Sequence, residues 1–210
     1  WVAFLPSKID ARVPVANRYF GVFQSGEIKV RGLEARRRDT PVWIAAVQKE
    51  LIALLGKARK KSELQDCLRD AFAFYQHALE NLKKGLIPPE QLVINGKVSY
   101  ALEAYKASTA SVRAAYQLQN AGMTVKPGMR VRFVYTRGEP DVLAWDLGKK
   151  IAPEALNSDK YIELLIRASG AVLTPFGISL DLLREWSLKD GVQLRLLGSP
   201  TVSGQKVWLA

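Results

Sequence analysis

The segment between residues 62 and 85 constrains the fold most, because it carries an uninterrupted helical pattern. Its apolar residues recur at spacings of three and four, which places them on one face of an α-helix. These residues are Leu64, Cys67, Leu68, Ala71, Phe72, Tyr75, Ala78, Leu79 and Leu82. Ser62 to Gln65 has the form of a capping box, Gly85 can end the helix, and Pro88-Pro89 prevents its continuation. The sequence therefore predicts one long helix whose apolar stripe must pack against other elements.

Four shorter segments show the same helical spacing. They lie at residues 40–56, 111–120, 161–172 and 180–188. The first opens with Thr40-Pro41, an N-cap followed by a proline whose missing N–H costs nothing in the first turn. Its predicted apolar stripe is Val47, Leu51, Leu54 and Leu55. Gly56 and Gly122 are expected to end the first two helices, and Ser179 and Gly191 to cap and close the last.

A β pattern precedes these helices. Residues 18–23 and 28–33 alternate as two strands and flank a short turn with Ser25-Gly26 at its centre. A two-residue turn at that point would place Lys29 opposite Val22. The second strand is expected to run on through its arginines to Arg38. Because side chains alternate along a strand, a slip of one residue would move every side chain to the other face.

Residues 130–135 alternate as one more strand. The order of elements predicts an α+β fold, in which a short β-hairpin is followed by a mainly helical region with a small β element. A chain of 210 residues can bury the core of one large domain, or of one medium domain with an appendage. Its hydrophobic content of 48% is that of a globular protein and not of a disordered one.

The formal net charge of +11 points to phosphate-rich partners or to an anionic membrane surface. The sequence contains no apolar run of the roughly twenty residues that a spanning helix needs, and no signal-peptide pattern opens it. We therefore expect no membrane partner. Cys67 is the single cysteine, so an internal disulfide is excluded and a reducing compartment, the cytoplasm, is expected.

Residues that could form an active site are missing from the sequence. No glycine-rich loop precedes a Lys-Ser or Lys-Thr pair, so a Walker-type phosphate site is not expected. With one cysteine and one histidine, His77, a zinc site is not expected either, and His77 is interpreted as structural or exposed. The carboxylates form no Asp-x-Asp cluster of the kind that holds two magnesium ions. The sequence predicts no catalytic residue and no metal ligand.

Basic residues do gather, most densely between Lys29 and Arg38. Five cations lie there, and only Glu34 and Asp39 are available as local counter-charges. The segment is either a solvated strand face or a surface that binds a polyanion. Repulsion between its cations would lower stability unless an anion is bound, which favours the second interpretation. Further basic clusters lie at residues 17–19, 57–61, 105–106 and 126–132. Residues 57–61 are expected to form a solvated loop between helices, and Arg130 and Arg132 the wet face of a strand.

Several of these segments together resemble the end of the palm and the thumb of family B DNA polymerases of the archaeal type. They are Asn17-Arg18-Tyr19, Arg31-Gly32-Leu33-Glu34, Arg37-Arg38-Asp39, the stretch 87–92 with its Pro-Pro, Tyr105-Lys106-Ala107, and 125–129 with its Lys-Pro-Gly-Met turn. They follow one another in the family's order and spacing, and the resemblance covers the chain from about residue 9 onward. One tripeptide alone would be weak, but the whole series is specific.

The resemblance implies that residues 1–39 are the last palm strands and residues 40–210 the thumb. It implies binding of a primer–template duplex through phosphate contacts, which position the duplex without reading its sequence. The expected DNA-binding residues are Asn17, Arg18, Tyr19, Lys29, Arg31, Arg37, Arg38, Tyr105 and Lys106. Asn17 stands where the family has a lysine, and Ser111 stands near the place of the family's histidine after Tyr-Lys.

The family's metal-binding aspartates precede every segment matched here. The resemblance therefore implies that this chain does not catalyse alone, that Mg²⁺ serves the complete polymerase, and that the remaining palm, fingers and exonuclease lie in the same or a separate chain. Because the sequence starts at Trp1, we expect a fragment or a processed product. Two alternatives remain open: a stand-alone nucleic-acid-binding module, or an inactive remnant that binds proteins through Trp145, Trp186, Trp208 and the apolar residues from Val202 onward.

Overall fold

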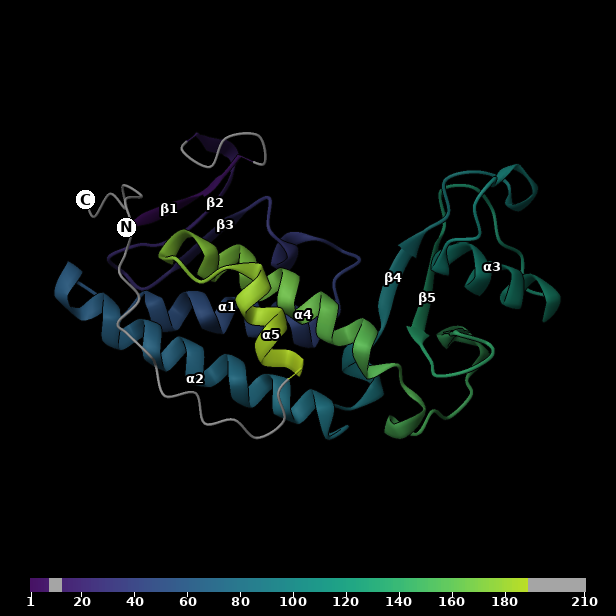
Figure 1. Ribbon diagram of the computed structural model, residues 1–210. Coiled ribbons are helices and arrows are strands. Elements are labelled where there is room, and N and C mark those ends of the chain that lie inside the picture. Colours follow the sequence, from purple (N-terminus) through teal and green to yellow (C-terminus); the bar gives the residue numbers. More distant parts are fainter. Residues whose placement is uncertain (8–12, 189–210) are drawn as a thin grey trace. The chain divides into compact units, whose positions relative to one another are not determined.

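A computed structural model describes residues 1–7 and 13–188 (Figure 1). Over these residues the chain forms five α-helices and two three-stranded antiparallel sheets, which confirms the predicted α+β class. The elements are β1 (Val2–Pro6), β2 (Pro14–Val22), β3 (Ile28–Arg31), α1 (Val42–Leu55), α2 (Leu64–Lys83), β4 (Ile94–Lys97), α3 (Ala110–Asn120), β5 (Arg130–Tyr135), β6 (Val142–Ala144), α4 (Ser158–Leu173) and α5 (Leu180–Leu188). None of the helices in this described part has the length and apolar character needed to cross a membrane.

The chain divides into two compact units. Unit 1 contains residues 1–37, 44–80 and the chain from 162 onward, and unit 2 contains residues 38–43 and 81–161. Compactness does not identify a palm or a thumb, so the division at residue 39 stays a prediction.

Helix α2 confirms the strongest sequence pattern, since all nine residues of its predicted stripe are buried. Its start differs from the prediction. The Glu63 carboxylate accepts hydrogen bonds from the backbone N–H groups of Arg59 (2.8 Å) and Lys60 (3.3 Å). These hydrogen bonds lower the pKa of the Glu63 carboxyl, and the bond from Arg59 has the largest effect. At the other end Gly85 takes a positive φ of 67°, as a helix-ending glycine does.

The remaining helices agree with the sequence to within a few residues. Helix α1 begins at Val42, just after the predicted Thr40-Pro41 start, and α4 begins at Ser158 and not at Tyr161. Leu54, predicted to be in the α1 stripe, is only half-buried. Ser179 caps α5 as predicted, because its hydroxyl accepts a hydrogen bond from the Leu182 N–H (3.1 Å). The predicted Gly191 stop, Trp208 and the segment from Val202 lie outside the described residues.

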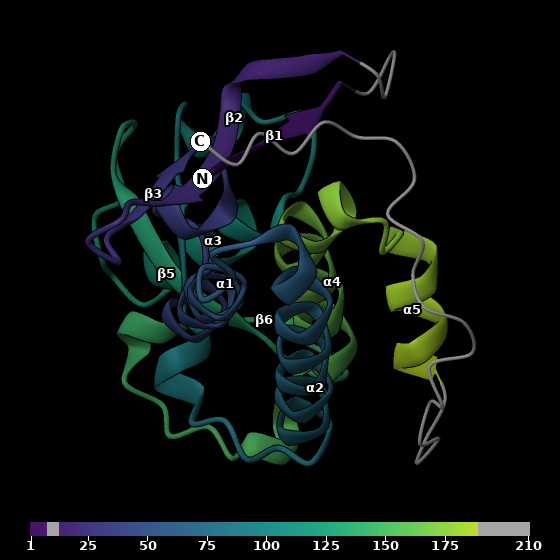
Figure 2. The same ribbon diagram turned by 90° about the vertical axis from the view of Figure 1, so that its left-hand side faces the viewer.

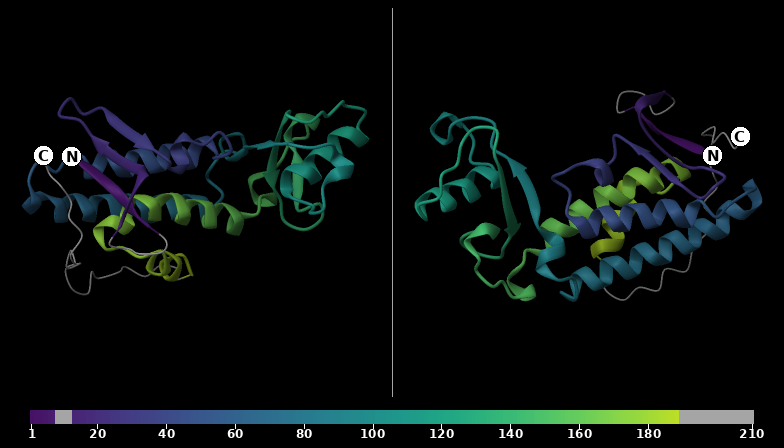
Figure 3. Two further views of the ribbon diagram at one scale, coloured as in Figure 1. Left: turned by 90° about the horizontal axis from the view of Figure 1, so that it is seen from above. Right: turned by 180° about the vertical axis from the view of Figure 1, so that it is seen from behind.

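Unit 1 packs its sheet on one side of a helical layer, as Figures 2 and 3 show from several directions. The strands lie in the order β1-β2-β3, and the unit 1 parts of α1, α2 and α4 run beside one another. An aromatic cluster joins sheet and helices, since the Phe20 ring lies 5.9 Å from that of Trp1 and 6.3 Å from that of Phe176. Tyr75 of α2 is fully buried, and its hydroxyl donates to the Leu183 carbonyl oxygen (3.5 Å).

The predicted register of the β2–β3 hairpin was wrong by one residue. Gly21 lies opposite Lys29 and Tyr19 opposite Arg31, so Lys29 does not face Val22. The turn has three residues and not two: the Phe23 N–H donates to the Glu27 carbonyl (2.9 Å), and the Gly26 N–H donates back to Phe23 (2.9 Å). Gly26 has a φ of 88°, which three-residue turns of this kind require at that position.

The sequence pattern also missed β1, which pairs with β2 and places Phe4 opposite Tyr19. Directly opposite residues in a sheet project from the same face. The true register therefore places Lys29 and Arg31 on the face of Phe4 and Tyr19, while Phe20 points into the core.

Unit 2 is built on the sheet β4-β5-β6, with α3 packed beside it (Figure 1). The Gln117 side chain of α3 fixes the edge strand β6, because it donates to the Val142 carbonyl (2.6 Å) and accepts from the Ala144 N–H (2.9 Å). Arg113 of the same helix makes a two-pronged ion pair with Asp141 (2.9 and 2.8 Å). The strand predicted at residues 130–135 is confirmed as β5.

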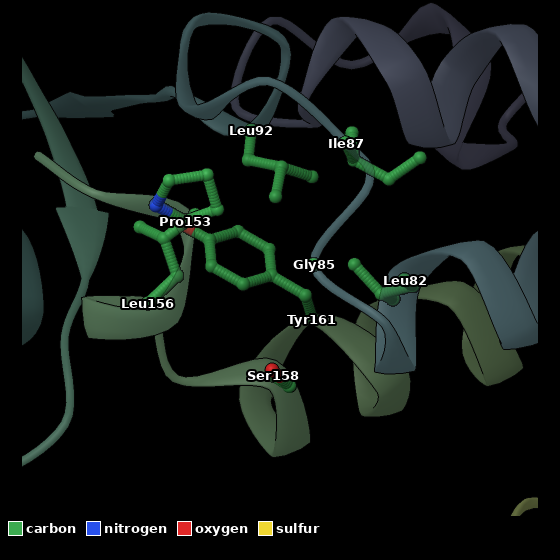
Figure 4. A pocket seen from close by; sticks show the side chains of 8 residues that line it. All are labelled: Leu82, Gly85, Ile87, Leu92, Pro153, Leu156, Ser158 and Tyr161. Carbon is green, nitrogen blue, oxygen red and sulfur yellow. The ribbon is translucent and has the colours of Figure 1, made fainter.

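A small apolar pocket lies inside unit 2, seen in Figure 4. Its lining side chains carry no ionisable group except the phenol of Tyr161. The lining residues are Leu82, Gly85, Ile87, Leu92, Pro153, Leu156, Ser158 and Tyr161. Burial raises the pKa of Tyr161, and its hydroxyl already accepts a hydrogen bond from the Tyr135 N–H (3.0 Å). The pocket is part of the packing of this unit and offers no chemistry.

Candidate nucleic-acid interface

Unit 1 presents a basic and aromatic surface on the outer face of its sheet. We call this surface the first basic face; it consists of Asn17, Tyr19, Lys29 and Arg31, with Phe4 beside them. Lys29 and Arg31 are exposed on β3, and the rings of Phe4 and Tyr19 lie 5.4 Å apart. Phe4 is 43% exposed. The face combines cations with exposed ring surface.

Gly32 fixes the bend that follows Arg31. It has a φ of 69°, and an added Cβ would collide with the Asn17 carbonyl oxygen, so another residue would be strained and crowded there. The Arg18 Nε donates to the Gly32 carbonyl oxygen (3.3 Å). Arg18 is therefore half-buried beside this bend, with its side chain held against the backbone.

After Gly32 the chain does not continue as a strand, which corrects the predicted ribbon to Arg38. Residues Glu34–Arg36 form a 3₁₀ turn, so Arg36 and Arg37 do not lie on opposite strand faces. Arg36, Arg37 and Arg38 are all exposed, and Arg37 is engaged in an interaction of its own. The arginines lie on a compact turn leading to α1.

A buried glutamine anchors this turn. Gln48 of α1 is fully buried, and its amide oxygen accepts from the Ala35 N–H (2.6 Å). Its amide nitrogen donates to the Glu34 carboxylate (3.1 Å) and to the Ala168 carbonyl of α4 (2.6 Å). A buried carboxylate needs such donors. The network ties the arginine-bearing turn to two helices at once, and no sequence pattern pointed to Gln48.

In unit 2 the predicted residues Tyr105 and Lys106 have different environments. The Tyr105 hydroxyl accepts hydrogen bonds from the Ser99 N–H (2.5 Å) and the Tyr100 N–H (3.2 Å), so it holds a loop in place. Tyr100, which the sequence interpretation did not single out, is 64% exposed and meets Tyr105 edge to face at 5.6 Å. Lys106 is exposed.

The predicted residues therefore divide between the units. Unit 1 contains Asn17, Arg18, Tyr19, Lys29, Arg31 and Arg37, and unit 2 contains Arg38, Tyr105 and Lys106. His77 is exposed, one of the two states expected for it. Within residues 1–7 and 13–188, no three histidine, cysteine or acidic side chains gather closely enough to hold a metal ion.

Comparison with known proteins gives the chain its family. The sequence profile described as DNA polymerase family B matches residues 16–168. DNA polymerase 1 of Saccharolobus solfataricus is 28% identical over 78% of this chain and 18% of the relative, and DNA polymerase 1 of Aeropyrum pernix is 29% identical over 78% and 17%. The chain thus spans less than a fifth of the length of these curated relatives.

A similar fold occurs in the solved family B DNA polymerase from the archaeon Pyrobaculum calidifontis. The TM-score is 0.59 at 21% identity, and the match covers 78% of this chain and 20% of that one. This likeness supports the fold, and the profile match over most of the chain identifies the family. The chain belongs to DNA polymerase family B.

Proposed function

We propose that the chain is the duplex-binding end of a family B DNA polymerase, comprising the last palm strands and the thumb. It positions the primer–template through its phosphate backbone, and the nucleotidyl transfer itself takes place elsewhere in the complete enzyme. The observation that carries this proposal is the first basic face. Its two cations, Lys29 and Arg31, lie on one exposed sheet face next to the ring of Tyr19.

Charge and shape support phosphate contact at this place. Lys29 and Arg31 lie two residues apart on the same face of β3, so their charges repel each other, and DNA supplies closely spaced phosphates that would relieve this repulsion. Contacts of this kind fix the position of a duplex and carry no base information. A binding role close to DNA agrees with an intracellular, nucleoid-associated place of action.

The magnesium chemistry of a polymerase belongs, in this proposal, to the remaining palm in the same or a separate chain. The described residues do not fit a two-metal centre, because they offer no cluster of carboxylates. Fingers and exonuclease are likewise assigned to the remaining segment of the polymerase.

Of the two alternatives, the protein-binding remnant is the weaker. Trp145 and Trp186 are half-buried, and the Trp186 ring packs on Phe72 at 4.0 Å, so Trp186 serves packing within the chain. A stand-alone module would bind DNA in the same way. Palm aspartates encoded upstream in the same or a neighbouring reading frame would favour the polymerase over the stand-alone module.

Removing Arg37 and Arg38 together tests the proposed binding. We expect Arg37→Ala/Arg38→Ala to weaken binding of a labelled primer–template equally for two unrelated sequences. The slope of log affinity against log salt should flatten by up to about two, since each phosphate contact contributes about 0.9. Fluorescence anisotropy across a salt series measures both quantities. The control Lys60→Ala, an exposed cation in the predicted solvated loop, should leave the slope nearly unchanged. An unchanged slope in the double variant would assign these arginines to contacts within the protein.

A further inference from the structure

We propose that unit 2 carries a second phosphate-contact surface, on the face of the β4–β5 pair that α3 does not cover. We call it the second basic face; it consists of Asn95, Lys97, Arg130 and Arg132. Its occupant is the phosphate backbone of the DNA duplex. This inference rests on the proposed function, and it adds residues that neither the sequence interpretation nor the family likeness assigns to DNA.

The register of the sheet places two cations directly opposite each other. Lys97 pairs with Arg130 and Asn95 with Arg132, so all four side chains project from one face. The other face is apolar, since Val131 and Phe133 are buried and a Cβ added to Gly96 would press on Ser111 of α3. The alternation leaves the polar face of this pair exposed at Lys97, Arg130 and Arg132.

Neither Lys97 nor Arg130 forms an ion pair with a carboxylate in the part of the chain that the structure describes. Arg132 pairs with Asp146, its Nε 2.8 Å from the carboxylate, whereas the hydrogen bond recorded for the Arg130 guanidinium goes to the neutral Asn95 carbonyl (3.3 Å). Like charges directly opposite in a sheet are destabilising. An arrangement that lowers stability at an exposed position fits an anion that occupies it during function.

The surroundings hold this face rigidly. Beyond β4 the ladder continues, because the Val98 N–H donates to the Met129 carbonyl oxygen (2.9 Å) and the Val98 carbonyl oxygen accepts from the Gly128 N–H (2.6 Å). In the residues that follow Val98, the Tyr105 hydroxyl accepts hydrogen bonds from the Ser99 and Tyr100 N–H groups. Lys97 is thus fixed between the Lys-Pro-Gly-Met turn and the Tyr105 loop, a preorganisation that lowers the ordering cost of binding.

The test is the double variant Lys97→Gln/Arg130→Gln, compared with Lys149→Gln/Lys150→Gln, two exposed cations of the same unit. Anisotropy with a labelled primer–template across a salt series should show a slope flattened by up to about two for the first variant and nearly unchanged for the second. The thermal midpoint of the first variant should stay the same or rise, because a like-charge pair has been removed. Loss of DNA affinity together with unimpaired stability is a result that a purely structural role would not give.

The outcomes separate this inference from the proposed function. If Arg37→Ala/Arg38→Ala flattens the slope and Lys97→Gln/Arg130→Gln leaves it unchanged, the second basic face is overturned and the proposed function stands. A fall in thermal midpoint with no change in slope would also overturn it, since the pair would then be structural. Absence of salt-dependent binding by the unchanged chain would overturn both.

Discussion

Phe72→Ala should lower the free energy of unfolding by about 3–5 kcal/mol, the loss typical of a large aromatic removed from a core. Phe72 is 5% exposed on α2, and its ring contacts Trp186 at 4.0 Å and Tyr75 at 6.3 Å. The alanine would leave a cavity between two helices that are fixed by other contacts, so little relaxation is expected. Denaturant unfolding followed by circular dichroism measures the change.

Phe23→Ala is the matched control for this prediction. Phe23 is 52% exposed at the hairpin turn, and its loss should cost less than about 1 kcal/mol. If both variants lost the same small amount, the stripe on α2 would have to face solvent or a partner chain, and the packing described for unit 1 would be wrong.

Gln48→Leu should cost about 3 kcal/mol or more, although leucine has a similar size. The change removes the amide that serves the Glu34 carboxylate, the Ala35 N–H and the Ala168 carbonyl oxygen. Each buried polar group left without its partner costs about 1–3 kcal/mol. The arginine-bearing turn should loosen as well, because Gln48 bonds it to α1 and α4, although the ion pair between Arg167 of α4 and Glu34 (3.8 Å) remains.

The same denaturation experiment checks this prediction, with Gln65→Leu as control. Gln65 is exposed on α2, and its replacement should change stability by no more than about 0.5 kcal/mol. A loss below about 1 kcal/mol for Gln48→Leu would show that Glu34 and the backbone groups satisfy their hydrogen bonds without the glutamine.

Helices were predictable here because their signal is local. The spacing of apolar residues along α2, the Ser179 cap and the glycines after α2 and α3 act within a few positions of one another. Small differences at the ends have equally local causes. At α2 the Glu63 carboxylate caps backbone N–H groups before the helix, where the pattern had suggested Ser62.

The sheet of unit 1 was less predictable because strand pairing depends on distant residues and on the type of turn. Ser25-Gly26 suits a two-residue turn as well as a three-residue one, and the choice moves Lys29 from one face to the other. Strand β1 is short and contains a proline, so its alternation is weak evidence for a strand.

The sequence indicated the cations of the candidate site, but not the residues that hold them in place. Lys29 and Arg31 of the first basic face stand out in the sequence, since they belong to a group of five cations between residues 29 and 38. Gln48 and Phe4 do not stand out in the sequence, because a single glutamine in a helix, or a single apolar residue near the chain start, can occupy many ordinary environments. Their roles arise from contacts with Ala168 and Tyr19, which lie far away in sequence.

The central claim is that the first basic face binds DNA phosphates, and the salt dependence of Lys29→Gln/Arg31→Gln tests it most directly. Both side chains are exposed and lie outside the hydrophobic core, so the variant should fold as the unchanged chain does. Anisotropy with a labelled primer–template should show weaker binding, equal for two unrelated sequences, and a log–log salt slope flattened by up to about two. The control Lys60→Gln/Lys61→Gln, exposed cations outside this face, should leave the slope nearly unchanged. A slope for Lys29→Gln/Arg31→Gln equal to that of the unchanged chain would contradict phosphate contact at this face.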